Sequence, residues 1–325
     1  MNQVLAGIDI GGTKIAMALA TLSGDIIANR YMPTRPELGP NAIFENIAAA
    51  LHELAGENDS AVVAIGVGSP APIDVSNGLI MSPSNLRDWD RFPIVDLLGE
   101  RFSVPVRLEN DANAAALAEY LYGAGRGYEN LFYVTISTGI GGGIIINGEI
   151  YDGICTAAGE IGHTIVQPDG VRCNCGSRGC LETICAGVHI ARRTKELLAT
   201  GKSSVIIEMV PDIDQITAKT VVEAVRRNDP LAVGVWEETC RYLAIGLGNA
   251  VTLLAPEIVV IGGGIAAAGE LLFEPIRRLI PEYVSMIPAD RINIAPAALG
   301  TESGFRGAVA IAQTTYSRSD ATYAV

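Results

Sequence analysis

A histidine and three cysteines stand close together near the middle of the chain. His163 is followed by Cys173, Cys175 and Cys180, and an imidazole with three thiolates can close a tetrahedral zinc site. The spacing alone is typical of a structural clip remote from any active site. Glu160 and Glu182 flank the stretch, and such carboxylates are otherwise solvated surface groups. Their position favours a metal-pinned loop beside a pocket for a small polar ligand.

Cysteine usage and charge narrow the class of protein. The tight C-x-C-x4-C spacing favours metal ligation in a reducing compartment over a disulfide scaffold, and we expect Cys155, Cys185 and Cys240 to be packing residues. The start of the chain has no basic segment followed by a long apolar one, so we expect a soluble, cytoplasmic protein without a membrane partner. A formal net charge of −13 opposes binding to nucleic acid.

A glycine turn near the start carries the groups that phosphate and magnesium require. The segment Asp9-Ile10-Gly11-Gly12-Thr13-Lys14 offers an acid, backbone amides, a hydroxyl and an ammonium within six residues. It is not a Walker A loop, because Lys14 follows Thr13 and a strand, not a helix, is expected to come next. The alternative is an ordinary β-hairpin turn.

Two further glycine clusters strengthen the case for nucleotide binding. The stretch "ISTGIGGGIII" at 136–146, which contains Thr138 and Gly139, resembles "IDIGGTKIAMA" near the start. Both patterns predict strand, glycine turn, strand, which indicates two similar lobes. Gly262-Gly263-Gly264 follows the strand-like "EIVVI", where close packing of strand and helix explains the glycines as well as nucleotide contact does.

Polar residues follow a strand-like run at "VPVRL". Glu109-Asn110-Asp111-Ala112-Asn113 comes next and precedes an alanine-rich helix. Ligands of open α/β sheets bind at the carboxyl ends of strands, so Asp111 is the candidate general base and Asn110 a partner for substrate hydroxyls. The alternative for Asp111 is helix capping.

The order of strand-like and helix-like runs predicts an α/β fold. The chain has 325 residues, 49% of them hydrophobic, enough for one or two domains with a sizeable core. We place the N-terminal lobe at residues 1–112 plus roughly 304–325, and the C-terminal lobe at 113–303. Residues Ser303 to Gln313 are expected to form a closing helix, followed by a loosely held tail.

Six motifs, in order and over nearly the whole chain, resemble the ROK sugar kinases. They are "GIDIGGTK" at 7–14, "SPSNLRDW" at 82–89, "ENDANAAALAE" at 109–119, "STGIGGGI" at 137–144, "GEIGH" at 159–163 and "CNCGSRGCLE" at 173–182. The resemblance implies an actin-like, hexokinase-like ATPase fold with two ribonuclease H-like lobes. It is greatest for glucokinases, with kinases for fructose, N-acetylglucosamine, N-acetylmannosamine and allose nearby.

The resemblance also implies roles for single residues. Asp111 would be the catalytic base, and zinc would lie on His163, Cys173, Cys175 and Cys180. The sugar would contact Asn85, Asn110, Asp111, Glu160, His163 and Glu182. Magnesium and phosphate would be served by Asp9, Gly11, Gly12, Thr13 and Lys14, the phosphates also by Thr138 and Gly139, and the adenosine by Gly262 and Gly263.

The implied reaction is transfer of phosphate from ATP to glucose, giving glucose 6-phosphate in carbohydrate metabolism. Ala71 stands where many family members have glycine, which leaves the choice of hexose open. Relatives are often dimers or tetramers, so a homo-oligomer is expected. The alternatives are a kinase for another hexose and a sugar-sensing regulator. Repressors of the family carry a helix-turn-helix domain ahead of the first glycine motif, which here begins at Asp9, so we do not expect a repressor.

Overall fold

The computed structural model describes every residue except 84, 85, 87, 324 and 325. The chain forms two compact units, the first from residues 1–127, 143–158 and 298–325 and the second from 128–142 and 159–297. This division differs from the expected boundary near Asp111, because residues 113–127, 143–158 and 298–303 also belong to the first unit. Helix α3 (Asp111–Tyr122) packs on the sheet that precedes it, so the chain does not leave the unit at that point.

A five-stranded sheet in the order β3-β2-β1-β4-β7 forms the first unit. Strands β1, β2 and β3 are antiparallel, and β1, β4 and β7 are parallel. The strand expected after the first glycine turn is therefore confirmed. The bounds are β1 Asn2–Ile10, β2 Lys14–Ala20, β3 Ile26–Pro33, β4 Ser60–Ser69 and β7 Val106–Asn110, with a small ribbon of β5 Ile73–Asp74 and β6 Leu79–Ile80.

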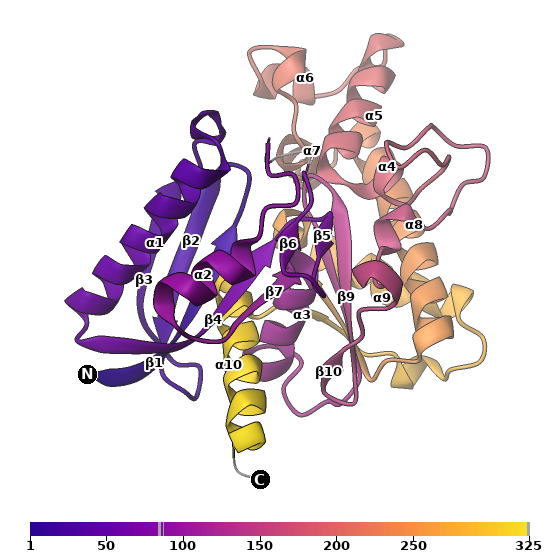
Figure 1. Ribbon diagram of the computed structural model, residues 1–325. Coiled ribbons are helices and arrows are strands. Elements are labelled where there is room, and N and C mark those ends of the chain that lie inside the picture. The colour runs from indigo at the N-terminus through magenta and orange to yellow at the C-terminus, as the bar shows by residue number, and fades with distance from the viewer. Residues whose placement is uncertain (84–85, 87, 324–325) are drawn as a thin grey trace. The chain divides into compact units, whose positions relative to one another are not determined.

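Helices cover both faces of this sheet (Figure 1). Helices α1 (Pro40–Glu57) and α2 (Ile94–Phe102) lie on one face, where Ile8 and Ile10 pack with Ile43 and Leu51. Helices α3 and α10 (Ser303–Tyr323) lie on the other. Side chains alternate along a strand, so Asp9 belongs to the α10 face. The closing helix predicted at Ser303 is confirmed and continues ten residues beyond Gln313.

The second sheet repeats the strand order of the first, as β10-β9-β8-β11-β12. Strands β8, β11 and β12 are parallel, and β9 and β10 are antiparallel. The similarity of the two glycine hairpins thus reflects a repeated topology. The bounds are β8 Leu131–Ile136, β9 Ile140–Ile146, β10 Glu149–Ile150, β11 Ile258–Gly262 and β12 Ile294–Pro296.

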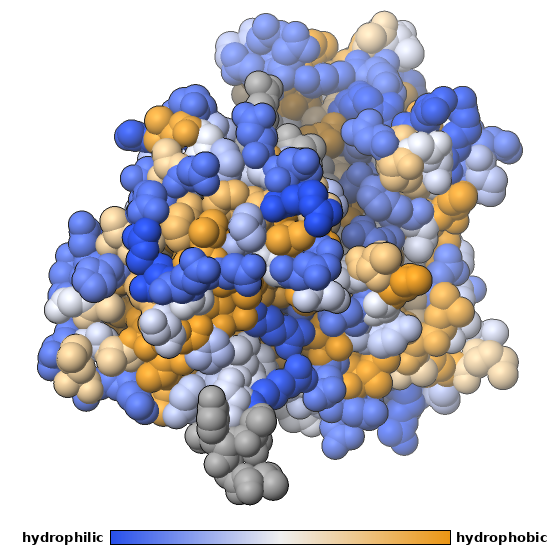
Figure 2. Space-filling model, in the orientation of Figure 1, coloured by the Kyte–Doolittle hydropathy of each residue, from blue (hydrophilic) through white to orange (hydrophobic). Residues whose placement is uncertain are grey.

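The second unit is mainly helical outside its strands (Figure 1). Its longer helices are α5 Gly187–Ala199, α7 Ala218–Arg226, α8 Pro230–Leu254 and α9 Glu270–Tyr283, and its shorter ones are α4 Glu182–Cys185 and α6 Ile206–Met209. Across the described residues, none of the helices has the length and apolar content that a bilayer crossing needs. Hydrophobic residues reach the surface in patches among hydrophilic ones (Figure 2).

Candidate active site and metal centre

The four predicted zinc ligands come together in the second unit. Their ligand atoms all lie within 4.8 Å of one another, with His163 Nδ1 3.6 Å from Cys173 Sγ and Cys175 Sγ 3.6 Å from Cys180 Sγ. Zinc-sulfur bonds of about 2.3 Å in a tetrahedron place two sulfurs about 3.8 Å apart. A backbone hydrogen bond from Ser177 lowers the pKa of Cys175 to about 7, which favours the thiolate. The residues fit a tetrahedral zinc ion.

The backbone of the loop holds these ligands in place. Cys173 N donates to Ser177 O at 2.8 Å, and both Val166 N and Gln167 N donate to Gly179 O. Gly179 has a φ of +69°, and a Cβ there would lie 1.5 Å from Gln167 O. Only glycine fits this position, next to the ligand Cys180. Backbone hydrogen bonds within the loop therefore shape the part of the chain that carries the cysteines.

The two predicted glutamates differ in what they contact. His163 Nδ1 faces the cysteines, while Nε2 lies 4.0 Å from Glu160 Oε2, a side chain about half exposed. Glu182 begins α4, and its Oε2 accepts a 2.9 Å hydrogen bond from Ile140 N. Glu182 thus joins the end of the loop that carries the cysteines, residues 163–182, to the second glycine turn. The sequence motifs do not reveal this contact.

A cavity of about 420 Å³ opens beside this glycine turn in the second unit. It is lined mainly by apolar groups of α5, α7 and the residues after β11, with Ser137 and Thr138 of the turn. Gly264 and Ile265 line it, whereas Gly262 and Gly263 are not among its lining residues. A Cβ on Gly263, whose φ is +83°, would lie 2.4 Å from Ile136 O. Gly263 is therefore explained by close strand packing.

Two lysines of this cavity were missed by the sequence analysis. Lys195 of α5 and Lys219 of α7 both line it, and Lys195 Nζ donates to Asp214 O at 2.8 Å. Neither belongs to a recognisable motif, because each is one polar residue on an ordinary amphipathic helix. Only the packing of α5 against α7 brings them to one cavity.

In the first unit, the end of β1 carries the partly buried carboxylate of Asp9. Burial and then the neighbouring Asp111 raise the pKa of Asp9 to about 6, and Lys14 opposes the shift. In the strand register, Asp9 of β1 pairs with Gly68 of β4, which in turn pairs with Glu109 of β7. Two carboxylates therefore stand in one row across three strands, with a glycine between them.

Thr34, a residue outside the motif, stabilises the first glycine turn through two hydrogen bonds. Thr34, which is buried, donates from Oγ1 to Gly11 O and from its backbone N to Thr13 O at 3.0 Å. Gly12, beside them, is half-buried, Thr13 and Lys14 are exposed, and Lys14 Nζ lies 5.0 Å from the centre of the Tyr31 ring. The turn presents a hydroxyl and an ammonium to solvent, as phosphate binding requires.

At the start of α3 the helix cap is Asn110 and not Asp111. Asn110 is the N-cap, and its Oδ1 accepts from Ala112 N at 2.9 Å and from Asn113 N at 3.3 Å. Asp111 is the first helical residue and is exposed. Capping, the alternative considered for Asp111, is thus the role of Asn110. The predicted sugar ligand Asn85 lies outside the described residues.

Two buried glutamates of the same motif have contacts that spacing did not predict. Glu109 and Glu119 are both fully buried. Glu119 accepts from Ala124 N at 2.8 Å, Ala298 N at 3.0 Å and Leu299 N at 2.9 Å, and so joins the turn after α3 to a loop far away in the sequence. For Glu119 the signal in the sequence is its place in an alanine-rich helix, since a glutamate on a helix that is buried requires partners.

One expectation about the cysteines is wrong. Cys185 and Cys240 are buried as expected, but Cys155 is exposed. It lies in a turn where both Cys155 and Thr156 have positive φ, 54° and 56°, so its side chain is not directed into a core.

Comparison with known proteins places the chain in a family. The sequence model of the ROK family matches residues 5–315. A glucokinase of Halalkalibacterium halodurans is 39% identical over 93% of this chain and 92% of its own length. The structure is similar to a ROK hexokinase from Thermus thermophilus (TM-score 0.85, 34% identity, covering 97% and 99% of the two chains). It is also similar to a ROK glucokinase from Streptomyces griseus in complex with glucose and AMPPNP (TM-score 0.78, 33% identity, 96% and 99%). The chain belongs to the ROK family.

Proposed function

We propose that this chain is an ATP-dependent glucokinase that transfers the γ-phosphoryl group to a hydroxyl of glucose. The observation that carries the proposal is the carboxyl end of β1 in the first sheet, where partly buried Asp9, exposed Asp111 and the glycine turn with Lys14 meet. A general base beside a phosphate-binding turn is the arrangement that phosphoryl transfer to an alcohol requires. Family membership and the glucokinase relatives support glucose as the acceptor.

Asp111 accepts the proton of the attacking hydroxyl in this proposal. It is exposed at the first turn of α3, so a substrate can reach it. An ionised carboxylate is the form that a base needs.

Asp9 fits the role of a magnesium ligand, directly or through water. Its carboxylate is partly buried and lies near Asp111, and two neighbouring acids attract a divalent cation. Magnesium neutralises charge on the phosphates of ATP when bound. Thr13 and Lys14 donate to phosphate oxygens, with Gly11 and Gly12 allowing close approach of the backbone.

The sugar is held by hydrogen bonds to its hydroxyls. In the first unit, Asn110 Oδ1 accepts the capping hydrogen bonds, so Nδ2 of this residue is the group that can donate to the sugar. Asn85 is a further candidate. In the second unit Glu160, Glu182 and the Nε2 atom of His163 are the candidates. Zinc on Nδ1 would fix the orientation and tautomer of His163, so the metal acts structurally.

The nucleotide is assigned to the cavity of the second unit. Thr138 and Gly139 bind phosphates, and the apolar walls formed by α5, α7, Gly264 and Ile265 accept the adenosine. Gly262 and Gly263 support this wall from the strand side. Lys195 and Lys219 are candidates for contact with ribose or phosphate. We also propose a cytoplasmic homo-oligomer, a dimer or tetramer, which light scattering of the purified protein tests.

The experiment is a coupled ADP-release assay with MgATP and a panel of sugars. Glucose, mannose, fructose, allose, N-acetylglucosamine and N-acetylmannosamine are compared at equal concentration. Glucose is expected to give the highest kcat/KM. A different preferred hexose would replace the substrate but keep the reaction. Sugar binding by calorimetry without turnover of any sugar would instead support a sensor.

A further inference from the structure

Glu109 is a buried charge for which the proposed chemistry has no direct use. Its side chain is fully buried at the end of β7, and burial raises its pKa above the ordinary range. An acid that a fold keeps away from water is retained through its hydrogen-bond and charge partners. Its partners therefore indicate its purpose.

The Glu109 carboxylate accepts hydrogen bonds from residues on both sides of Asp111 in the chain. Oε1 accepts from Asn110 N at 3.1 Å and from Asn113 Nδ2 at 3.0 Å. Asn113 is itself buried, and its Oδ1 has no hydrogen-bond partner among the described residues. The side chain of Asn113 is therefore oriented through Glu109 alone, and the residue before Asp111 and the residue two positions after it share one acceptor.

Helix capping does not account for this arrangement. The first free amides of α3, those of Ala112 and Asn113, are already satisfied by Asn110 Oδ1. Glu109 contacts the amide before the helix and a side chain within its first turn, so it sets the direction in which this turn leaves β7. Asp111 lies in that turn, and its direction changes with it.

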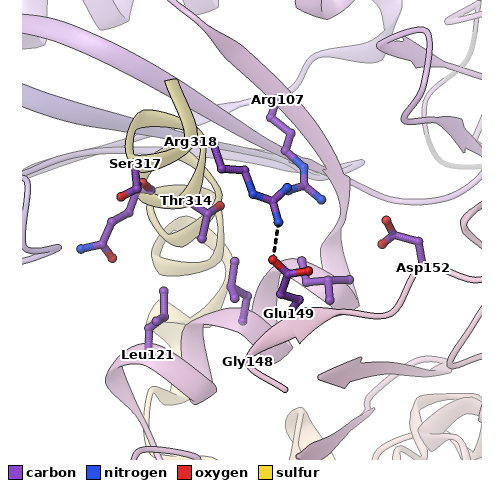
Figure 3. Close-up of a pocket in the computed structure, with 11 residues that line it drawn as sticks. Arg107, Leu121, Gly148, Glu149, Asp152, Thr314, Ser317 and Arg318 are labelled. Atoms are coloured by element: carbon purple, nitrogen blue, oxygen red, sulfur yellow. Dashed lines mark hydrogen bonds and ion pairs between the residues drawn. The ribbon is translucent and has the colours of Figure 1, made fainter. Parts of the chain in front are cut away.

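Arg107 is the counter-ion of this carboxylate. Its Nη2 atom lies 3.0 Å from Glu109 Oε2, two residues earlier on the same strand face. Arg107 also lines a cavity of about 490 Å³ with Arg318 and Asp152 (Figure 3). Arg318 pairs with Glu149 at 3.1 Å. The Arg107 side chain is about one-fifth exposed, so it can be replaced with less damage to the core than Glu109.

We propose that Glu109, supported by Arg107, is a positioning residue that fixes the first turn of α3 and thereby aims the Asp111 carboxylate at its substrate. The inference rests on the proposed function, in which Asp111 is the general base. Misplacement of a reacting group by about 1 Å can cost about 100-fold in rate. The effect of losing Glu109 should therefore fall on kcat and leave nucleotide binding largely intact.

The test compares three variants of the full chain with the wild type. Glu109→Gln keeps the size of the side chain but places an amide donor against Arg107. Arg107→Gln removes the counter-ion. Asp229→Asn is the matched control, a buried acid of the second unit that accepts from Ala232 N and Val205 N, each at 2.9 Å, at the start of α8. Measurements are kcat, KM for ATP and sugar, the melting temperature, and amide hydrogen exchange at residues 110–113.

For Glu109→Gln we expect kcat to fall about 10- to 100-fold, KM for ATP to change less than about twofold, and exchange at residues 110–113 to become faster. Arg107→Gln should change the same quantities in the same direction by less. Asp229→Asn should lower the melting temperature while kcat stays within about twofold, which separates positioning from general destabilisation.

Wild-type kcat and wild-type exchange in folded Glu109→Gln would overturn the inference. If that variant does not fold, the same two results in Arg107→Gln overturn it. A kcat loss in Asp229→Asn as large as that in Glu109→Gln would also do so, because any buried acid would then suffice. Absence of sugar-dependent turnover in the wild type would refute the proposed function instead, and the exchange measurement would still report on Glu109.

Discussion

The two sheets share one strand order but carry different groups at corresponding positions. In the first, Asp9, Gly68 and Glu109 stand side by side on β1, β4 and β7. In the second, Thr135 of β8 pairs with Gly262 of β11, and Ala297 lies against that glycine. The middle strand of the three carries a glycine in both rows. The places of Asp9 and Glu109 in the first sheet are taken by the hydroxyl of Thr135 and the methyl group of Ala297 in the second.

This difference separates two kinds of chemistry on one topology. The acids of the first sheet supply charge, with the proposed base next to them. The second sheet supplies the backbone turn at Thr138 and an apolar cavity, and its charged groups arrive from outside the sheet, on the zinc loop. Repeating a fold thus fixes where a site can form, and a few side chains decide what it does.

The largest expected effect tests whether Asp111, at the carboxyl end of the first sheet, is the general base. Asp111→Asn should lower kcat by about 100- to 10,000-fold, the usual contribution of a general base, with little change in KM for ATP. Asp96→Asn is the matched control, because Asp96 also lies in the first turn of a helix of the first unit. Steady-state ADP release measures both. Retained kcat in Asp111→Asn would remove Asp111 from the chemistry.

The next effect tests whether ligand binding by the second unit depends on the proposed zinc site. Cys175→Ser removes an exposed residue of the proposed zinc site and should lower the zinc content and raise KM for glucose about tenfold or more. KM for ATP should rise as well, because Glu182 connects the loop to Ile140 of the glycine turn. Metal analysis and kinetics measure this. Zinc-free protein with wild-type KM values would contradict a supporting role for the metal.

A third prediction concerns the stability cost of Asp9. Its folded pKa of about 6 lies above the ordinary 3.8, so its favourable contribution to folding is complete below pH 3.8 and is lost as pH rises through 6. Without metal, Asp9→Asn should therefore stabilise the protein by about 2–3 kcal/mol at pH 7, at about 1.36 kcal/mol per pKa unit, and abolish most activity.

Urea unfolding in EDTA at pH 5, 6 and 7 measures this effect. The corresponding change in the second sheet, Thr135→Val, should alter the free energy of unfolding by less than about 1 kcal/mol with no trend in pH. Equal pH trends in the two variants would show that Asp9 is not the source of the pH dependence of the free energy of unfolding.

The smallest expected effect concerns the nucleotide cavity. Lys219→Met should raise KM for ATP about two- to fivefold, because an exposed ion pair contributes about 0.2–1 kcal/mol, and should leave kcat unchanged. Lys202→Met is the control, since Lys202 is exposed in the same unit and is not among the residues that line the cavity. Equal KM values in the two variants would place the nucleotide elsewhere.

Local spacing predicted much of the fold and site. The predicted zinc ligands lie close together in the chain, so their separation in sequence already limits their separation in space. The glycine turns after β1 and β8, the repeated topology and the acid at the start of α3 were also predicted correctly. The assignment of capping to Asn110 and the packing role of Gly263 required coordinates, because neighbouring residues with similar side chains can exchange such roles.

The sequence by itself determined the family, the cluster of His163 with three cysteines and the two strand-turn-strand repeats, because each depends on residues close together in the chain. The tertiary structure alone decided that Asp9 and Glu109 share a row, that Thr34 supports Gly11, and that Glu182 reaches Ile140. These contacts join residues 23 to 100 positions apart. Strand register and loop packing set them, and both follow from the burial of the whole core, which no local pattern records.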